Sequence, residues 1–177
     1  ENPMSLLSRT AAATLLTMLS AGPLYAEALD VRIGYLQWVP DKGPVLSNII
    51  PEPEDAGLRG AELGLADNQT TGRFLGQNYK LESEVVDSHE EALGAFELMQ
   101  TSGTQLFVVN APAQTVQAIM GMASENALIF NAGAKDDQLR TDQCHPNLLH
   151  TVPSYAMLTD SLGQWLNMRR WTNLFLI

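Results

Sequence analysis

Hydrophobic and polar positions fall into short apolar runs separated by segments with helical spacing. The apolar runs predict strands over residues 31–38, 79–87, 106–109 and 127–131. Between them, apolar residues recur every three or four positions, which predicts helices over residues 55–68, 88–103 and from Pro112 onward. Strands that alternate with helices are typical of right-handed βαβ units. We therefore predict an α/β fold, a doubly wound parallel sheet.

Local signals support these boundaries and extend the pattern to the end of the chain. Ser88 and Glu91 have the spacing of a capping box, and Ser154 suits the N-cap of a last helix. Before that helix we expect a helical turn at 136–140 and an extended segment at 147–153, and after it a strand at 174–177. The apolar residues expected on the buried face of the last helix are Met157, Leu158, Leu162, Trp165 and Leu166.

Glycines in the first helix suggest close packing. Gly57, Gly60 and Gly64 recur along one side of that helix. Each glycine lowers helix propensity, so we expect this side to lie against the sheet or a neighbouring element.

Small and polar residues follow three of the predicted strands. Carboxyl ends of parallel strands meet at one edge of a sheet, and ligands of open α/β folds bind there. The candidate ligand-binding residues are Gln37, Trp38, Asn110, Ala111, Asn131, Ala132, Gly133 and Lys135. Trp38 either stacks on a planar ligand or fills the core of its loop, and Lys135 and Arg140 either pair with ligand carboxylates or remain solvated.

Composition narrows the class of partner. Of the 177 residues, 45% are hydrophobic and 17% are charged, which is typical of a globular protein. The formal net charge is −10, with only ten lysines and arginines. A protein that binds phosphate backbones needs clustered cations, so we expect no nucleic-acid partner.

Catalytic signatures are missing from the sequence. It contains no Gly-x-x-x-x-Gly-Lys-Ser/Thr phosphate loop and no Gly-x-Ser-x-Gly elbow. His89 follows the Ser88 cap and is expected to point to solvent. Cys144, His145 and His150 lie near aspartates, but their spacing matches no zinc pattern. We expect neither an enzyme nor a metal site.

The first 26 residues resemble a signal peptide. A charged start from Met4 to Arg9 precedes an apolar run at 11–19, and small residues lead to an expected cut between Ala26 and Glu27. Residues 1–3 look like stray upstream residues. The apolar run is too short for a permanent membrane helix, and no cysteine at the cut offers a lipid anchor. We expect a protein exported to the periplasm without stable membrane insertion. Cys144 is either free or paired outside this sequence.

The mature sequence resembles the type I periplasmic substrate-binding proteins of ABC transporters, of the leucine/isoleucine/valine-binding kind. Stretches 31–36, 57–65 and 146–154 carry this resemblance. Stretches 130–140, 144–154, 157–166 and 169–171 are similar to a subgroup associated with pyrroloquinoline quinone-dependent alcohol dehydrogenase systems.

The resemblance implies two lobes that close over a small ligand and deliver it to an ABC-type membrane permease. Residues 27–152 would form the first lobe, with a hinge crossing at 147–153, and residues 153–177 would begin a second, similar lobe that is truncated here. Candidate ligands are pyrroloquinoline quinone, which is planar and carries three carboxylates, or a solute linked to alcohol oxidation. The alternatives are a domain that reports solute to a membrane receptor and a binding protein for an amino acid-like solute. No resident cofactor is implied.

Overall fold

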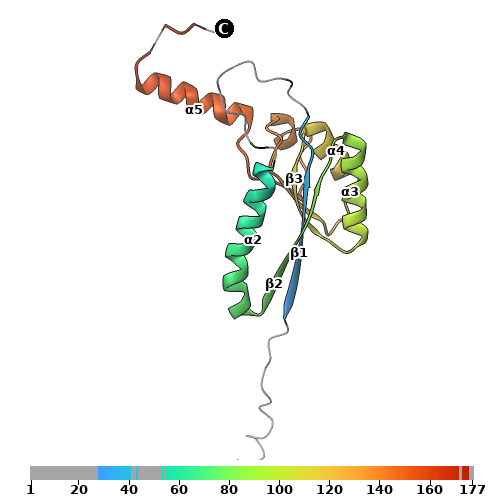
Figure 1. Cartoon of the computed structure of the whole chain (residues 1–177). Helices are drawn as coiled ribbons and strands as arrows, with labels where there is room; N and C mark the ends of the chain where they lie inside the picture. Colours follow the sequence, from blue (N-terminus) through green and yellow to red (C-terminus); the bar gives the residue numbers. More distant parts are fainter. Residues whose placement is uncertain (1–27, 41–42, 44–52, 54, 172, 176–177) are drawn as a thin grey trace, which may run out of the picture.

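The computed structural model describes residues 28–40, 43, 53, 55–171 and 173–175, which form one five-stranded sheet flanked by helices (Figure 1). The strand order is β2-β1-β3-β4-β5, and every pair is parallel. The predicted doubly wound α/β fold is therefore confirmed. The elements are, in chain order, β1 (Leu29–Gln37), α2 (Ala56–Leu75), β2 (Gln77–Val85), α3 (His89–Thr101), β3 (Leu106–Asn110), α4 (Ala113–Met122), β4 (Leu128–Asn131), the 3-10 helix η1 (Asp137–Arg140), β5 (Leu148–His150) and α5 (Tyr155–Met168).

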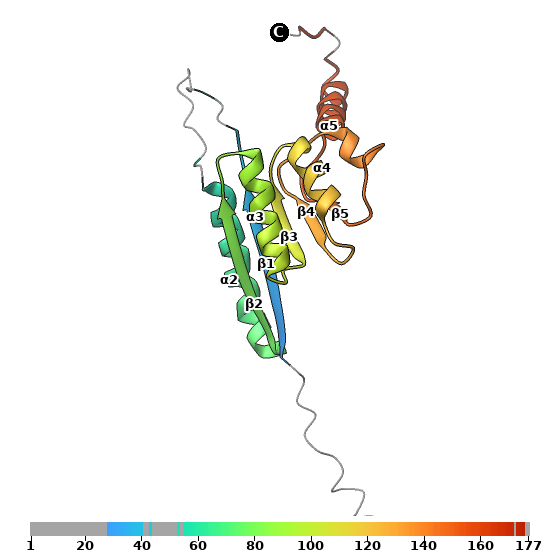
Figure 2. The ribbon, with the colours of Figure 1, turned by 90° about the vertical axis from the view of Figure 1, so that its right-hand side faces the viewer.

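The main core lies between the sheet and the helices α3 and α4. These two helices cover one face of the sheet, and α2 covers the other (Figures 1 and 2). Phe96 of α3 and Phe107 of β3 are both fully buried, with ring centroids 4.6 Å apart. Ile119 of α4 and Ile129 of β4 complete the centre of this layer. Burial of these side chains supplies the main favourable contribution to folding.

Helix caps follow the predicted signals. The Ser88 hydroxyl accepts a hydrogen bond from the Glu91 amide at 3.2 Å, and the Glu91 carboxylate accepts one from the Asp87 amide. Ser154 caps α5 by accepting from the Met157 amide at 3.3 Å. Each cap satisfies backbone donors that the first turn of a helix leaves without partners.

Helix α2 packs on the sheet at its two ends and leaves a groove between them. A Cβ added at Gly72 would lie 2.8 Å from the Gln77 carbonyl oxygen, and Gly57 is crowded in the same way. A Cβ at Gly60 or Gly64 meets nothing within 4 Å, so the predicted glycine packing is wrong at these two positions. Gly60 is exposed, and Gly64 lines a groove of about 310 Å³ together with Ile33, Ala61, Leu65, Asn68, Tyr79, Leu81 and Val108.

Two predicted features near the carboxyl end are not found. The apolar face of α5 is exposed, with Leu162 56% and Trp165 40% accessible, because α5 runs away from the sheet (Figure 2). The Trp165 ring packs instead against Trp171, at a centroid distance of 5.0 Å. Residues 173–175 form no strand, and the rest of the predicted strand at 174–177 lies outside the described residues.

The predicted signal peptide, residues 1–26, also lies outside the described residues. Among the helices that the structure describes, none is both long enough and apolar enough to cross a membrane.

Candidate functional site

The parallel strands bring the predicted site residues to one edge of the sheet. Gln37 at the end of β1 is the register partner of Asn110 at the end of β3, and Val109 is the partner of Asn131. The Trp38 amide donates to the Asn110 carbonyl at 3.0 Å, and the Ala132 amide donates to the Val109 carbonyl at 2.8 Å. Backbone pairing with β3 thus continues one residue past β1 and one past β4, which holds the three strand exits side by side.

A polar cluster lies at this edge on the side of α2. The Tyr35 hydroxyl donates to Gln37 Oε1, and Asn110 Nδ2 lies 3.4 Å from the same oxygen. Burial raises the pKa of the Tyr35 phenol, so the hydroxyl stays protonated and remains a donor. A Cβ at Gly57 would lie 2.9 Å from Gln37 Oε1 and 3.1 Å from Asn110 Nδ2. The first turn of α2 therefore lies directly against the cluster.

Trp38 lies on the opposite side of the sheet, beside α3 and α4. Its ring is half-buried against the hydrophobic core and meets the His89 ring edge-on, at a centroid distance of 5.9 Å. His89 Nδ1 is 2.9 Å from the hydroxyl of Thr115, a buried residue of α4. The expectation that His89 points to solvent is therefore wrong, because its ring links the start of α3 to α4.

The loop after β4 is organised by the side chain of its first residue. Asn131 is 0% exposed. Its Oδ1 accepts from the amides of Gly133 at 3.1 Å and Ala134 at 2.8 Å, and its Nδ2 donates to the Ala134 carbonyl at 2.7 Å. The Asn131 amide group thus shapes the loop from within, and the half-buried Ala132, Gly133 and Lys135 form its outer surface.

Gly133 is required by packing. A Cβ at this position would lie 2.8 Å from the Ala111 amide nitrogen and 3.1 Å from the Ala111 carbonyl oxygen. The side-chain oxygen of Asn110 lies on the same side. The loop after β4 therefore lies tightly against the exit of β3, and no larger residue fits between them.

Lys135 brings a positively charged side chain to the loop after β4. Its carbonyl accepts from the Tyr155 amide at 2.9 Å, which fixes its backbone at the start of α5. Its side chain is half-buried, and among the described residues its ammonium group forms no hydrogen bond or ion pair. The first turn of α4 begins nearby, after Pro112, and its amide groups add further donors at the same edge.

Arg140, which the sequence offered as a partner for ligand carboxylates, and His150, which it offered only as a metal ligand, complete the edge at β5. His150 Nδ1 lies 3.0 Å from Asn131 Nδ2, and Arg140 Nη2 donates to the Val152 carbonyl. Arg140 Nη1 is buried and has no hydrogen-bond partner among the described residues. Burial, followed by the charge of Arg140, lowers the pKa of His150. The sequence signal was the position of His150 within the extended segment predicted at 147–153; it is the last residue of β5.

The chain leaving β5 is tied to the loop after β4. The Asn131 carbonyl accepts from the Thr151 amide at 3.0 Å and from the Thr151 hydroxyl at 3.1 Å. The carboxylate of Asp137 in η1 accepts from the Ala156 amide at 3.2 Å. The loop, η1 and the start of α5 are therefore held together by hydrogen bonds.

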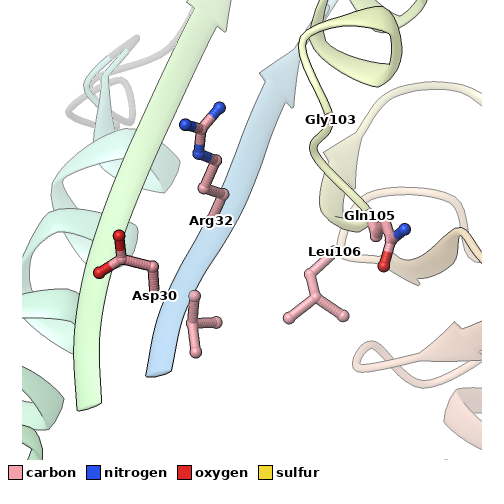
Figure 3. Close-up of a pocket in the computed structure, with 6 residues that line it drawn as sticks. Asp30, Arg32, Gly103, Gln105 and Leu106 are labelled. Atoms are coloured by element: carbon pink, nitrogen blue, oxygen red, sulfur yellow. The ribbon is translucent and has the colours of Figure 1, made fainter. Parts of the chain in front are cut away.

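A second hollow, of about 360 Å³, lies at the opposite edge, near the amino ends of β1 and β3 (Figure 3). Its charged residues are already engaged. Arg32 donates to the Ser102 carbonyl at 3.1 Å, and Asp30 lies 3.5 Å from Lys80 Nζ. A hydrogen bond from Asn78 and the charge of Lys80 lower the pKa of Asp30. This hollow offers a ligand fewer available charged groups than the carboxyl edge does.

Metal ligands do not gather in the described part of the chain. No group of three or more His, Cys, Asp or Glu side chains there is placed to hold an ion. Cys144 is exposed and unpaired.

Comparison with known proteins bears on the fold. No family model matches the sequence, and no curated protein matches it. Among solved structures, the chain is similar to the leucine-, isoleucine-, valine-, threonine- and alanine-binding protein from Brucella ovis in its closed conformation, with a TM-score of 0.62 and 19% sequence identity. The match covers 84% of this chain and 38% of that one, so the chain spans well under half of that structure's length. This likeness concerns the fold: the chain shares the α/β fold of the matched part of that structure.

Proposed function

We propose that this chain is the first lobe and hinge of a periplasmic solute-binding protein of an ABC transporter. The observation that carries the proposal is the convergence of three strand exits, with Asn110, Gly133 and Lys135, at one edge of a parallel sheet. Such an edge binds a small solute through backbone amides and a few side chains, without performing chemistry on it. The Brucella ovis protein, which is named for binding small molecules, has the same lobe fold.

The proposed organisation follows from how α5 joins the sheet. Residues 27–152 form the first lobe, residues 147–153 the hinge crossing, and residues 153–177 the beginning of a second lobe. In support, Thr151 donates to the Asn131 carbonyl at the end of β4 and the Val152 carbonyl accepts from Arg140 of η1, whereas α5 buries no residue in the described structure. Residues 1–26 would direct export. Amino-terminal sequencing of the protein recovered from the periplasm should then begin at Glu27, and a product that retains residues 1–26 would contradict this step.

For the ligand, the residues favour a small molecule that carries a carboxylate. Lys135 offers a positive charge, the first turn of α4 and the loop after β4 offer amide donors, and Trp38 presents part of an aromatic ring at the same edge. Pyrroloquinoline quinone suits this set through its flat rings and three carboxylates. An amino acid is the second candidate, because the Brucella ovis protein is named for binding five of them.

Titration of the isotopically labelled chain followed by NMR tests both candidates. Pyrroloquinoline quinone and, separately, leucine and alanine are added up to about 1 mM, which covers weak binding by a partial cleft. We expect shifts of the Ala132 and Gly133 amides and of the Trp38 indole, and no shifts at Arg32 or Gln105. Lys135→Ala should weaken binding by about tenfold, the effect of one charge-assisted hydrogen bond, and Lys80→Ala serves as the matched control. Shifts confined to the Arg32 hollow, or none with any probe, would contradict the proposal.

A further inference from the structure

The amide group of Asn131 can adopt only one orientation. Its Oδ1 accepts from the amides of Gly133 and Ala134, and its Nδ2 donates to the Ala134 carbonyl. Rotating the amide by 180° would place the NH₂ group against two amide donors and the oxygen against a carbonyl. Because Asn131 is fully buried, water cannot compensate for these losses.

This orientation determines the protonation state of His150. Asn131 Nδ2 points its second hydrogen toward His150 Nδ1, 3.0 Å away. Nδ1 must therefore accept, so the proton of the neutral imidazole is on Nε2. Protonation of Nδ1 would set two donors against each other, and the Asn131–His150 hydrogen bond would be lost.

The surroundings of His150 favour the neutral ring. From η1, Arg140 brings the one charged side chain that acts on the imidazole, and it opposes a second positive charge. From β4, Asn131 is uncharged. The acidic residue of η1, Asp137, accepts a hydrogen bond from the Ala156 amide. Burial and Arg140 lower the pKa of His150, and a hydrogen bond to the Leu139 backbone only partly offsets them.

We propose that His150 is a positioning residue for the loop at 131–135, and that its protonation loosens this loop and weakens ligand binding as the medium becomes acidic. The ligand part rests on the proposed function. The loop carries Gly133 and Lys135 at the candidate site, and its shape depends on the Asn131 amide that His150 holds. Thr151, the next residue after His150, donates to the Asn131 carbonyl. Protonation of His150 therefore also affects the segment that leads to α5.

The loop part is tested without ligand, by NMR of the full chain between pH 8 and pH 5. The ¹⁵N shifts of His150 should report a neutral ring with the proton on Nε2 at pH 8. The hydrogen-exchange protection factors of the Gly133 and Ala134 amides should fall by about two- to tenfold as His150 protonates, the effect of losing a hydrogen bond. His150→Gln keeps an acceptor that does not titrate, so its protection factors should stay constant. His145→Gln removes an exposed histidine and should behave as the unmodified chain.

A second variant should reverse the direction of the pH dependence of amide protection, and it can be measured even if His150→Gln does not fold. In Asn131→Asp, a carboxylate oxygen faces His150 Nδ1 and favours the protonated ring, so acid should tighten the loop. Protection at Gly133 and Ala134 that is independent of pH in the unmodified chain, or that changes equally in His150→Gln, would overturn the positioning role.

The ligand part is tested by repeating the titration with pyrroloquinoline quinone and leucine at pH 8 and pH 5. Binding that weakens in the unmodified chain and not in His150→Gln supports the proposal. Equal binding at both pH values, while the loop loosens, would overturn the ligand step. If neither probe binds at either pH, the proposed function and the ligand step both fail, while the exchange measurements still decide the role of His150 in the loop.

Discussion

At the scale of single residues, the candidate edge depends on positions where main chains approach closely. Gly133 lies against the backbone of Ala111, and Gly57 lies against the side chains of Gln37 and Asn110. A sequence shows that such residues are small, but it does not show which of them are crowded. Gly60 and Gly64 are the same residue type, yet a Cβ added at either position meets nothing within 4 Å. The difference arises from tertiary packing, which periodicity along the chain does not encode.

Gly133→Ala should destabilise the chain by about 1–3 kcal/mol, because the added methyl group overlaps backbone atoms that cannot move without shifting β3. Urea unfolding followed by circular dichroism measures the change. Gly94→Ala is the control: it lies inside α3 with open space around it and should stabilise by about 0.5–1 kcal/mol. Equal effects of the two substitutions would contradict the packing described for Gly133.

Protonation of His150 should also reduce global stability in acid. The folded-state pKa is lower than the ordinary value of 6.5, so below pH 6.5 the unfolded chain binds more protons than the folded chain. This contribution is therefore intact above pH 6.5 and is lost as the pH falls through the folded-state pKa. Urea unfolding at pH 7.5 and pH 5.5 should show a smaller loss for His150→Gln than for the unmodified chain. An identical loss in both would show that His150 titrates normally.

At the scale of elements, the hydrophobic pattern predicted the order and type of almost every helix and strand. The boundaries followed where a local signal existed, as at the Ser88 and Ser154 caps. Helix α2 extends seven residues beyond its predicted end at residue 68 and stops where Gly76 adopts a left-handed conformation, φ 68°. Residues 69–73, which follow the predicted end, are polar or glycine and carry no hydrophobic signal, so the sequence did not mark this extension.

The contact between α2 and the site should respond to substitutions along one side of the helix. Gly57→Ala should shift the first turn of α2 and alter the NMR signals of the Gln37 and Asn110 side-chain amides, because the new methyl group meets both groups. Gly60→Ala should leave these signals unchanged and stabilise the helix by about 0.5–1 kcal/mol. Unchanged amide signals in Gly57→Ala would mean that α2 does not contact the polar cluster.

The site itself was predictable only in outline. Parallel strands imply that Gln37, Asn110 and Asn131 end at one edge, and the structure places them there. Which way each side chain points depends on loop geometry. Asn131 turns inward to its own loop, and Trp38 packs beside His89 on the far side from Gln37. The contact of His150 with Asn131 joins residues 19 positions apart, which no local pattern reveals.

At the scale of the whole molecule, the sheet and α5 behave as separate parts. The sheet with α2, α3 and α4 contains the core, whereas α5 extends from its carboxyl edge with an exposed apolar face (Figure 1). The helical spacing of Leu162 and Trp165 correctly predicted a helix. This spacing could not show whether another described element packs against the apolar face of α5, because a covered and an exposed face have the same amphipathic pattern.

Stability should reflect this division. Leu162→Ala should change the free energy of unfolding by less than about 0.5 kcal/mol, as is usual for exposed positions, whereas Phe107→Ala should cost about 3–5 kcal/mol, because that ring is fully buried. Urea unfolding of both variants gives the comparison. A loss above about 1 kcal/mol for Leu162→Ala would show that the α5 face is covered in solution.

The position of β1 between β2 and β3 has a consequence for how the chain folds. Among the described strands β1 comes first in the chain, yet Asn110, which reaches Gln37 across the β1–β3 pair, lies 73 residues further along. During synthesis this long loop must close before β1 pairs with β3, which slows folding. Until β3 has been synthesised, one edge of β1 has no partner strand. A chain truncated before β3 would expose an unpaired edge of β1, which could pair with strands of other chains.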